Sequence, residues 1–168
     1  MDKYCIPEGL HISHIFPSFH KNVNSLDFNF CFSNNCIYDL KDDDNRDVNK
    51  LYGLGFGINH HNNSIRIGWN CEKKNGNIQL HAYYYNNSKR NIAYICEVKT
   101  KVICHCVLSF DRVLNKFFIY VKDDEKTINA EFKFDFKECK KWGFKLYPYF
   151  GGNKTAPHKM SLYLKDIK

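Results

Sequence analysis

Alternation of apolar and polar residues with a period of two recurs along most of this chain. In the run L-D-F-N-F-C-F from Leu26 to Phe32, every second residue is large and apolar, so one face of an extended strand would be buried. The segment 52–58 (Y-G-L-G-F-G-I) alternates apolar residues with glycine, which lets a neighbouring backbone or a ligand approach closely. Because a strand with one apolar face must pack against another layer, the pattern predicts an all-β protein.

Segments of the same kind follow at short, regular intervals. Further strands are predicted over 64–69, 78–85, 92–96, 102–110, 117–121, 131–136, 144–150 and 160–164. Turn signals separate them, the strongest being Asn75-Gly76. About ten to twelve short strands at this spacing are typical of an antiparallel sandwich or barrel. The helical candidate is a turn or two near 136–140, and residues 1–168 form one expected domain with its core at about 26–164.

Composition excludes several classes of protein. The chain has 168 residues, 43% of them hydrophobic and 26% charged, which fits one globular domain and neither a disordered nor a fibrous chain. Apolar runs are far shorter than the ~20 residues of a membrane span. The start Met1-Asp2-Lys3-Tyr4-Cys5 lacks the pattern of a secretory signal, so the sequence predicts a cytoplasmic protein with no membrane partner.

The charge balance indicates anionic partners. Lys and Arg outnumber Asp and Glu 25 to 18, a net charge of +7, which can attract phosphates, nucleic acid or acidic sugars. Since no block of five or six basic residues occurs, binding to nucleic acid is not indicated, and a solvated basic surface explains the excess equally well. In the acidic stretch 39–50, Asp42-Asp43-Asp44 lacks the glycine and closing Glu of a calcium loop, which favours a solvated loop.

The eight cysteines do not indicate a metal site. The sequence contains no C-x-x-C pair, and Cys104 and Cys106 would share one face of a strand while His105 takes the other. Reduced thiols are expected, with no metal and no cofactor. The phosphate loop, the G-x-S-x-G and H-E-x-x-H motifs and the dinucleotide fingerprint are also absent from the sequence.

The two strands around the Asn75-Gly76 turn carry the most informative polar residues. If the isoleucines on either side of Arg66 face the core, pleating turns the alternate residues of both strands outward. This outward face carries Ser64, Arg66, Gln79, His81, Tyr83 and Tyr85. Flat aromatic rings beside fork-shaped donors suit sugar rings, and an arginine suits a carboxylate or a phosphate. The same residues would also suit an ordinary solvent-facing sheet.

Two loops are expected to frame this face. His61 lies in the loop 60–63, and Asn153 and His158 lie in the loop 151–158. These three residues are therefore predicted ligand-binding positions. Adjacent histidines can converge from a loop, so His60, His61 and His158 could together hold a metal, but ordinary hydrogen bonding in the loops is favoured.

Three segments carry a resemblance to known proteins: D-V-N-K-L-Y-G at 47–53, H-H-N-N-S-I-R-I-G-W at 60–69, and Y-P-Y-F-G-G-N with A-P-H at 147–158. The chain resembles small β-sandwich proteins of gut-type bacteria and their phages, over about residues 26–164. Its ending is similar to that of concanavalin A-like jelly rolls. The resemblance implies a single antiparallel β-sandwich of jelly-roll type, in a superfamily of lectins, laminin-G-like modules, glycoside hydrolases and polysaccharide lyases whose ligands commonly lie on the concave sheet.

The departures from this superfamily narrow the expected function. The Glu-x-Asp-x-Glu strand of its hydrolases is absent, and no outward strand supplies the two carboxyl groups that glycoside hydrolysis needs. The leading hypothesis is a non-catalytic domain that binds a glycan or another anionic polar ligand. In the polysaccharide-lyase alternative, Tyr83 or Tyr85 is the general acid/base, His81 assists and Arg66 neutralises a uronate. A third hypothesis is a phage-encoded protein that binds a nucleotide signal or a host protein, self-associates or decorates a virion.

Overall fold

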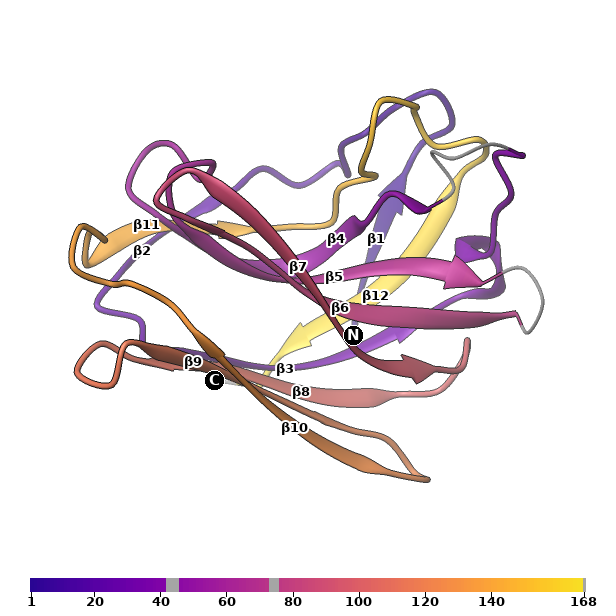
Figure 1. The fold of residues 1–168 in the computed structure, drawn as a ribbon. Helices are drawn as coiled ribbons and strands as arrows, with labels where there is room; N and C mark the ends of the chain where they lie inside the picture. Colours follow the sequence, from indigo (N-terminus) through magenta and orange to yellow (C-terminus); the bar gives the residue numbers. More distant parts are fainter. Residues whose placement is uncertain (42–45, 73–75, 168) are drawn as a thin grey trace.

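The structure is a computed structural model that describes residues 1–41, 46–72 and 76–167. Within these ranges, the regular structure consists of twelve strands and the short 3₁₀ helix η1 (Asn34–Cys36). The strands form two six-stranded sheets, sheet A and sheet B, in which neighbouring strands are antiparallel and which pack face to face (Figure 1). The all-β fold is therefore confirmed, and it is a sandwich rather than a barrel.

The two sheets interleave distant parts of the chain. In spatial order, sheet A contains β1 (Asp2–Ile6), β12 (Met160–Asp166), β3 (Ser25–Phe32), β8 (Cys104–Asp111), β9 (Lys116–Lys122) and β10 (Thr127–Lys133). Sheet B contains β2 (Ser18–Lys21), β11 (Trp142–Leu146), β4 (Asn49–Phe56), β5 (Ser64–Glu72), β6 (Asn77–Asn86) and β7 (Lys89–Val98). Neighbours such as β12 and β3 are far apart in sequence, and such crossover connections are typical of a jelly roll.

The core between the sheets is aromatic. The four apolar side chains of β3 are each at most 1% exposed, as the alternation predicts. They meet sheet B directly: the Phe32 ring centroid lies 5.1 Å from that of Trp69, and the Phe28 centroid 5.0 Å from that of Tyr52. Full burial of a side chain of this size contributes roughly 1.5–3 kcal/mol. This core fixes which faces of β4, β5 and β6 point away from it.

Some of the predicted elements differ from the observed ones. The short edge strands β1 and β2 were not predicted, because four or five residues carry little alternation. The prediction of a helical turn near 136–140 is wrong, because this segment forms a non-helical turn. The side chains of Phe134 and Phe136 are buried just outside β10, at 1% and 3% exposure, so the expected strand 131–136 ends earlier than predicted. Asp42-Asp43-Asp44 and the start of the Asn75-Gly76 turn lie outside the described residues.

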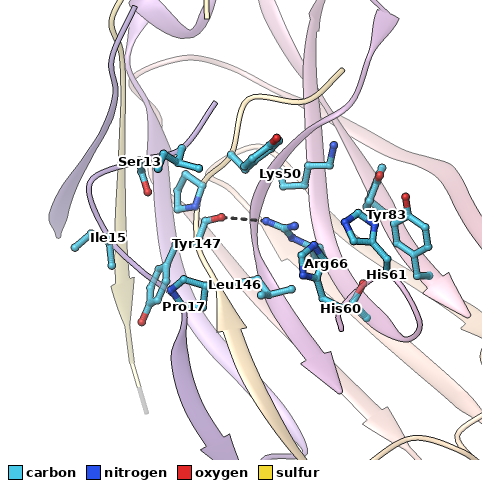
Figure 2. Close-up of a pocket in the computed structure, with 15 residues that line it drawn as sticks. Ser13, Ile15, Pro17, Lys50, His60, His61, Arg66, Tyr83, Leu146 and Tyr147 are labelled. Carbon is cyan, nitrogen blue, oxygen red and sulfur yellow. Dashed lines mark hydrogen bonds between the residues drawn. The ribbon is translucent and has the colours of Figure 1, made fainter. Parts of the chain in front are cut away.

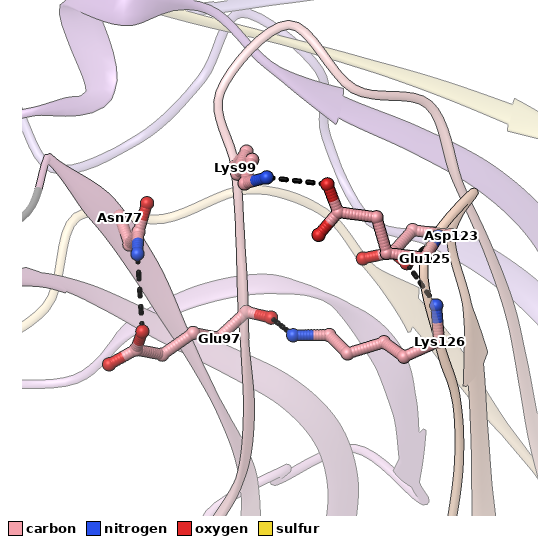
Figure 3. Close-up of polar contacts among 6 residues, drawn as sticks. All are labelled: Asn77, Glu97, Lys99, Asp123, Glu125 and Lys126. Carbon is pink, nitrogen blue, oxygen red and sulfur yellow. Dashed lines mark hydrogen bonds and ion pairs between the residues drawn. The ribbon is translucent and has the colours of Figure 1, made fainter.

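Polar contacts join the two sheets along one side of the sandwich (Figure 3). The Lys126 ammonium, in the β9–β10 turn, donates to the backbone carbonyl of Glu97 on β7. Beyond the end of β7, the Lys99 ammonium lies 2.5 Å from a carboxylate oxygen of Glu125. An ion pair as exposed as that of Lys99 and Glu125 adds little to the free energy of unfolding.

No helix in the described ranges has the length and apolar character to cross a membrane.

Candidate ligand-binding site

The outer face of sheet B carries Arg66. Ile65 and Ile67 are fully buried in the core, so the side chain between them points to the opposite face, as predicted. In the strand register, Arg66 lies between Gly53 on β4 and Tyr83 on β6. A Cβ atom at position 53 would lie 2.5 Å from Arg66 Cα and 2.8 Å from its Cγ. Gly53 therefore leaves the space that the Arg66 side chain occupies.

A β-bulge brings a second cation to the same face. The register between β4 and β5 shifts between Lys50 and Tyr52, so Leu51 is the extra residue and is fully buried in the core. Lys50 then pairs with Gly68 on the outer face. Its Nζ lies 4.4 Å from the ring centroid of Tyr83, within the range of a cation–π interaction.

Two segments cover this face, so it is a pocket and not the open platform that the sequence predicted. Residues 147–150 run beside Lys50, with Lys50 and Tyr149 exchanging two backbone hydrogen bonds of 2.8 and 3.0 Å. Residues 7–17 lie beside residues 147–150 and are joined to them by a 2.7 Å hydrogen bond from Phe150 N to the His11 carbonyl. Beneath both segments is a cavity of about 350 Å³, which we call the Arg66 pocket.

Five parts of the chain line the Arg66 pocket. The lining residues are Ile12, Ser13, Ile15, Pro17, Lys50, His60, His61, Ser64, Arg66, Tyr83, Tyr85, Leu146, Tyr147, Pro148 and Tyr149. Figure 2 shows Ser13, Ile15 and Pro17 on one side, His61 and Tyr83 on the other, and the guanidinium between them. The pocket thus combines charged groups of the sheet with apolar and aromatic groups of the covering segments.

The Arg66 guanidinium is buried with few partners. The residue is only 6% exposed, its Nη2 donates to the Tyr147 carbonyl at 3.0 Å, and its buried Nε has no hydrogen-bond partner. None of the ion pairs between described residues involves Arg66 or Lys50. Burial lowers the pKa of Arg66 to about 10, so the guanidinium remains charged at neutral pH. A buried cation without a counter-ion favours an anionic ligand.

Burial shifts the neighbouring titratable groups as well. The pKa of Lys50 is lowered to about 8, by burial first and then by the Arg66 charge, while Asp47 acts in the opposite direction. Burial and the nearby cations lower the pKa of His60 to about 4, so its imidazole is neutral at pH 7. Burial and Tyr85 raise the pKa of Tyr83 to about 12, so its phenol keeps its proton. At neutral pH the pocket therefore offers cations and neutral donors.

Two hydroxyl groups in the pocket wall also lack partners. The Ser13 and Ser64 Oγ atoms are buried and make no hydrogen bond within the described structure. Leaving a buried polar group unpaired costs roughly 1–3 kcal/mol, so such groups concentrate where water or a ligand completes them. Together with Arg66, Lys50 and the tyrosine rings, they suit a small, polar, negatively charged molecule with a flat or ring-shaped body.

The pocket gathers half of the predicted binding residues. Arg66, Tyr83, Tyr85 and His61 line it, and the His61 and Tyr85 rings meet edge to face with centroids 4.9 Å apart. His60 and Ser64, also singled out by the sequence, line it too.

The other predicted residues lie elsewhere. His81 Nε2 lies 3.1 Å from Asn70 Oδ1, and Gln79 pairs with Asn70 in the register, so both lie outside the pocket lining. Val48 covers Gly68, the residue paired with His81, since a Cβ on Gly68 would come within 2.4 Å of Val48 Cγ1.

The loop 151–158 does not frame the pocket either. Asn153 is exposed, His158 Nε2 lies 2.9 Å from the Asn35 carbonyl, and neither residue lines the pocket. The His60 and His61 rings lie with centroids 4.2 Å apart, but no group of three or more His, Cys, Asp or Glu that could hold a metal occurs within the described ranges.

Several pocket residues were missed at the sequence level. Lys50 lies two residues before Tyr52, and strict alternation with Tyr52 would turn it inward; the bulge between them reverses its direction. Ser13, Tyr147 and Tyr149 belong to covering segments that reach the face through long-range pairing. The Y-P-Y-F-G-G-N motif carries part of the resemblance to known proteins, but its tyrosines were not predicted as binding residues.

The fold is a two-sheet antiparallel β-sandwich of jelly-roll type, and solved structures share it. The acidic lectin of winged bean, solved with methyl-alpha-D-galactose, is similar in fold with a TM-score of 0.53 and 8% identity, over 89% of this chain and 68% of the lectin. Tailspike protein 2 of the Escherichia coli O157:H7 bacteriophage CAB120 is similar with a TM-score of 0.50 and 8% identity, over 94% of this chain. The chain spans only 23% of the tailspike's length. At this identity both likenesses show the fold alone, and no protein-family model or curated protein sequence matches the chain.

Proposed function

We propose that this protein is a non-catalytic carbohydrate-binding domain whose Arg66 pocket holds an acidic sugar. The observation that carries the proposal is the buried Arg66 guanidinium, which has no carboxylate partner among the described residues and lies beside a second cation, Lys50. A guanidinium presents parallel N–H donors that match a carboxylate, and charge-assisted hydrogen bonds are the strong ones in proteins.

The remaining groups suit the body of a sugar. Tyr83 and Tyr85 supply ring faces, while Ser13, Ser64 and the neutral His60 supply polar atoms for hydroxyl groups. Pockets for small ligands combine mostly apolar walls with a few oriented polar groups in this way. The winged bean lectin with a similar fold was solved with a galactoside, which supports testing sugars first.

The pocket supports binding more than the polysaccharide-lyase alternative. In the lyase alternative Tyr83 or Tyr85 is the general acid/base, and for Tyr83 burial raises the pKa of the phenol to about 12, so that this residue keeps its proton at working pH. The proposed assistant His81 and the amide Gln79 do not line the pocket. Incubation with uronate polymers should therefore produce no absorbance from a new double bond; a rising trace would overturn the non-catalytic proposal.

The direct test compares sugars that differ only in the acid group. Isothermal titration at pH 7 with glucuronate, glucose and glucose 6-phosphate should give the tightest binding for glucuronate and at least about a hundredfold weaker binding for glucose, which lacks the partner of both cations. A preference for glucose 6-phosphate, or for a nucleotide monophosphate used as competitor, would contradict a carboxylate-specific pocket. Equal affinity for glucose and glucuronate would remove the assigned role of Arg66.

The affinity for glucuronate should fall at alkaline pH because Lys50 loses its charge there. The pKa of Lys50 is about 8, below its ordinary value, so its ammonium is mostly present at pH 7 and mostly lost at pH 9. The sugar carboxylate does not titrate in this range, and the affinity should drop about tenfold between these pH values. Titrations at both values measure this effect.

The Lys50→Met variant supplies the control for this pH dependence. It should bind glucuronate about tenfold more weakly at pH 7 and show a nearly flat profile to pH 9. Lys99→Met removes a lysine charge at an exposed ion pair beyond the end of β7 and should leave affinity and profile unchanged. An undiminished pH dependence in Lys50→Met would show that another group titrates.

A further inference from the structure

A second hollow lies on the outer face of sheet B beside the Arg66 pocket. We call it the Phe144 groove; its volume is about 370 Å³, and it is lined by Pro17, Gly55, Gly57, Ile58, His60, Phe144 and Leu146. Apart from His60, whose pKa is lowered to about 4, none of these residues carries an ionisable side chain. The groove is thus uncharged at neutral pH, in contrast to the pocket beside it.

The groove and the pocket adjoin. Pro17, His60 and Leu146 line both, so these three residues form the boundary between them. In the strand register, Leu146, Gly53 and Arg66 follow one another across three strands, and Phe144, Gly55 and Ser64 form the next row. His60 and Leu146 lie over Gly55, since a Cβ there would be 3.0 Å from His60 Cβ and 3.3 Å from Leu146 Cδ1. A molecule held at Arg66 would therefore pass over these two side chains to reach the Phe144 ring.

The shape of the groove favours a sugar ring over an alkyl chain. Ile58, on its rim, is 83% exposed, so an occupant is covered from one side only. The gain from apolar contact scales with the area removed from water, and an alkyl chain lying here would stay largely hydrated. A sugar ring has one face of C–H groups for Phe144 and a rim of hydroxyls for water, which fits one-sided contact.

Aromatic rings continue beyond the groove. The Phe144 ring meets Phe19 edge to face with centroids 6.1 Å apart, and Phe19 stacks on Trp142 at 6.2 Å. Phe19 is 63% exposed although it is large and apolar. Exposed aromatic residues beside a hollow often mark a binding surface, here one that prolongs the groove.

From this geometry, and resting on the proposed function, we infer that the site binds a saccharide of at least two units in which an acidic unit is followed by a neutral one. The acidic unit occupies the Arg66 pocket, and the neutral unit lies against Phe144. A chain of uronates alone is disfavoured, since its second carboxylate would lie in a groove without a cationic lining residue and lose hydration.

Titrations with five probes test this inference. Glucuronosyl-galactose should bind about tenfold more tightly than glucuronate, whereas digalacturonate should gain less than twofold over galacturonate. Octyl glucuronide reports on an alkyl occupant. Tighter binding of octyl glucuronide than of glucuronosyl-galactose, or an equal gain for digalacturonate, would overturn the inference while leaving glucuronate binding intact. Failure to bind glucuronate at all would instead overturn the proposed function.

Two variants locate the second unit. Phe144→Ala should abolish the gain of glucuronosyl-galactose over glucuronate and leave glucuronate affinity within twofold, which also shows that the variant is folded. Ile58→Ser changes an exposed side chain and should reduce the gain two- to threefold without risk to the core. Tyr120→Ala, on the outer face of sheet A, is the matched aromatic control and should change neither affinity. A full gain in both Phe144→Ala and Ile58→Ser would contradict the placement.

Discussion

The Gly53→Ala variant should lose about 3 kcal/mol of unfolding free energy and its glucuronate binding. The added Cβ would lie 2.2 Å from the Ile65 carbonyl oxygen and 2.5 Å from Arg66 Cα, both backbone atoms of β5. Because neither atom can move without parting β4 from β5, the clash strains the centre of sheet B, and overpacking of this kind costs roughly 1–3 kcal/mol. Urea unfolding followed by tryptophan fluorescence measures the loss.

Gly55→Ala is the matched comparison for this prediction. Gly55 lies two residues along the same face of β4, where a Cβ would be 3.0 Å from His60 Cβ and 3.3 Å from Leu146 Cδ1. Since His60 belongs to a loop that can shift, we expect a loss of about 1 kcal/mol. If Gly55→Ala were as damaging as Gly53→Ala, the effect would come from glycine replacement in general and not from the place that Gly53 leaves for Arg66.

The fold was largely predictable because alternation is a local property. Leu26 to Phe32 and Ile65 to Trp69 have apolar residues at every second position, and those side chains form the core. The same parity correctly turned Arg66 away from the core. Short edge strands such as β1 escaped prediction, because their place depends on pairing with β12 at the far end of the chain.

The pocket was only partly predictable, because its walls depend on long-range contacts. Pleating alone assigned Arg66 and Tyr83 to one face, and neighbouring registers brought them together. The direction of the Lys50 side chain depends on the bulge at Leu51, which moves the residues before it to the opposite face of the sheet. Covering of the face required the pairing of Tyr149 with both Lys50 and Ile12. Neither the bulge nor this pairing can be predicted from local spacing, so an open platform was predicted where a partly covered pocket forms.

Replacing the buried guanidinium should separate its binding role from its structural cost. We expect Arg66→Met to lower glucuronate affinity about a hundredfold, because it removes the main partner of the carboxylate. In the absence of ligand, the same variant should gain about 1 kcal/mol of unfolding free energy, since burial of an unpaired charge costs more than its one hydrogen bond to the Tyr147 carbonyl contributes. Calorimetric titration and urea unfolding measure the two effects.

Arg112 provides the opposite case. Its guanidinium donates to the Cys139 and Lys140 carbonyls at 3.1 and 3.0 Å and lies 5.3 Å from the ring centroids of Phe110 and Phe136. These contacts are complete without a ligand, so Arg112→Met should lose about 1–2 kcal/mol of unfolding free energy and keep full glucuronate affinity. If Arg66→Met instead lost stability as Arg112→Met does and still bound glucuronate, Arg66 would be a structural residue, and the pocket would have no anion to hold.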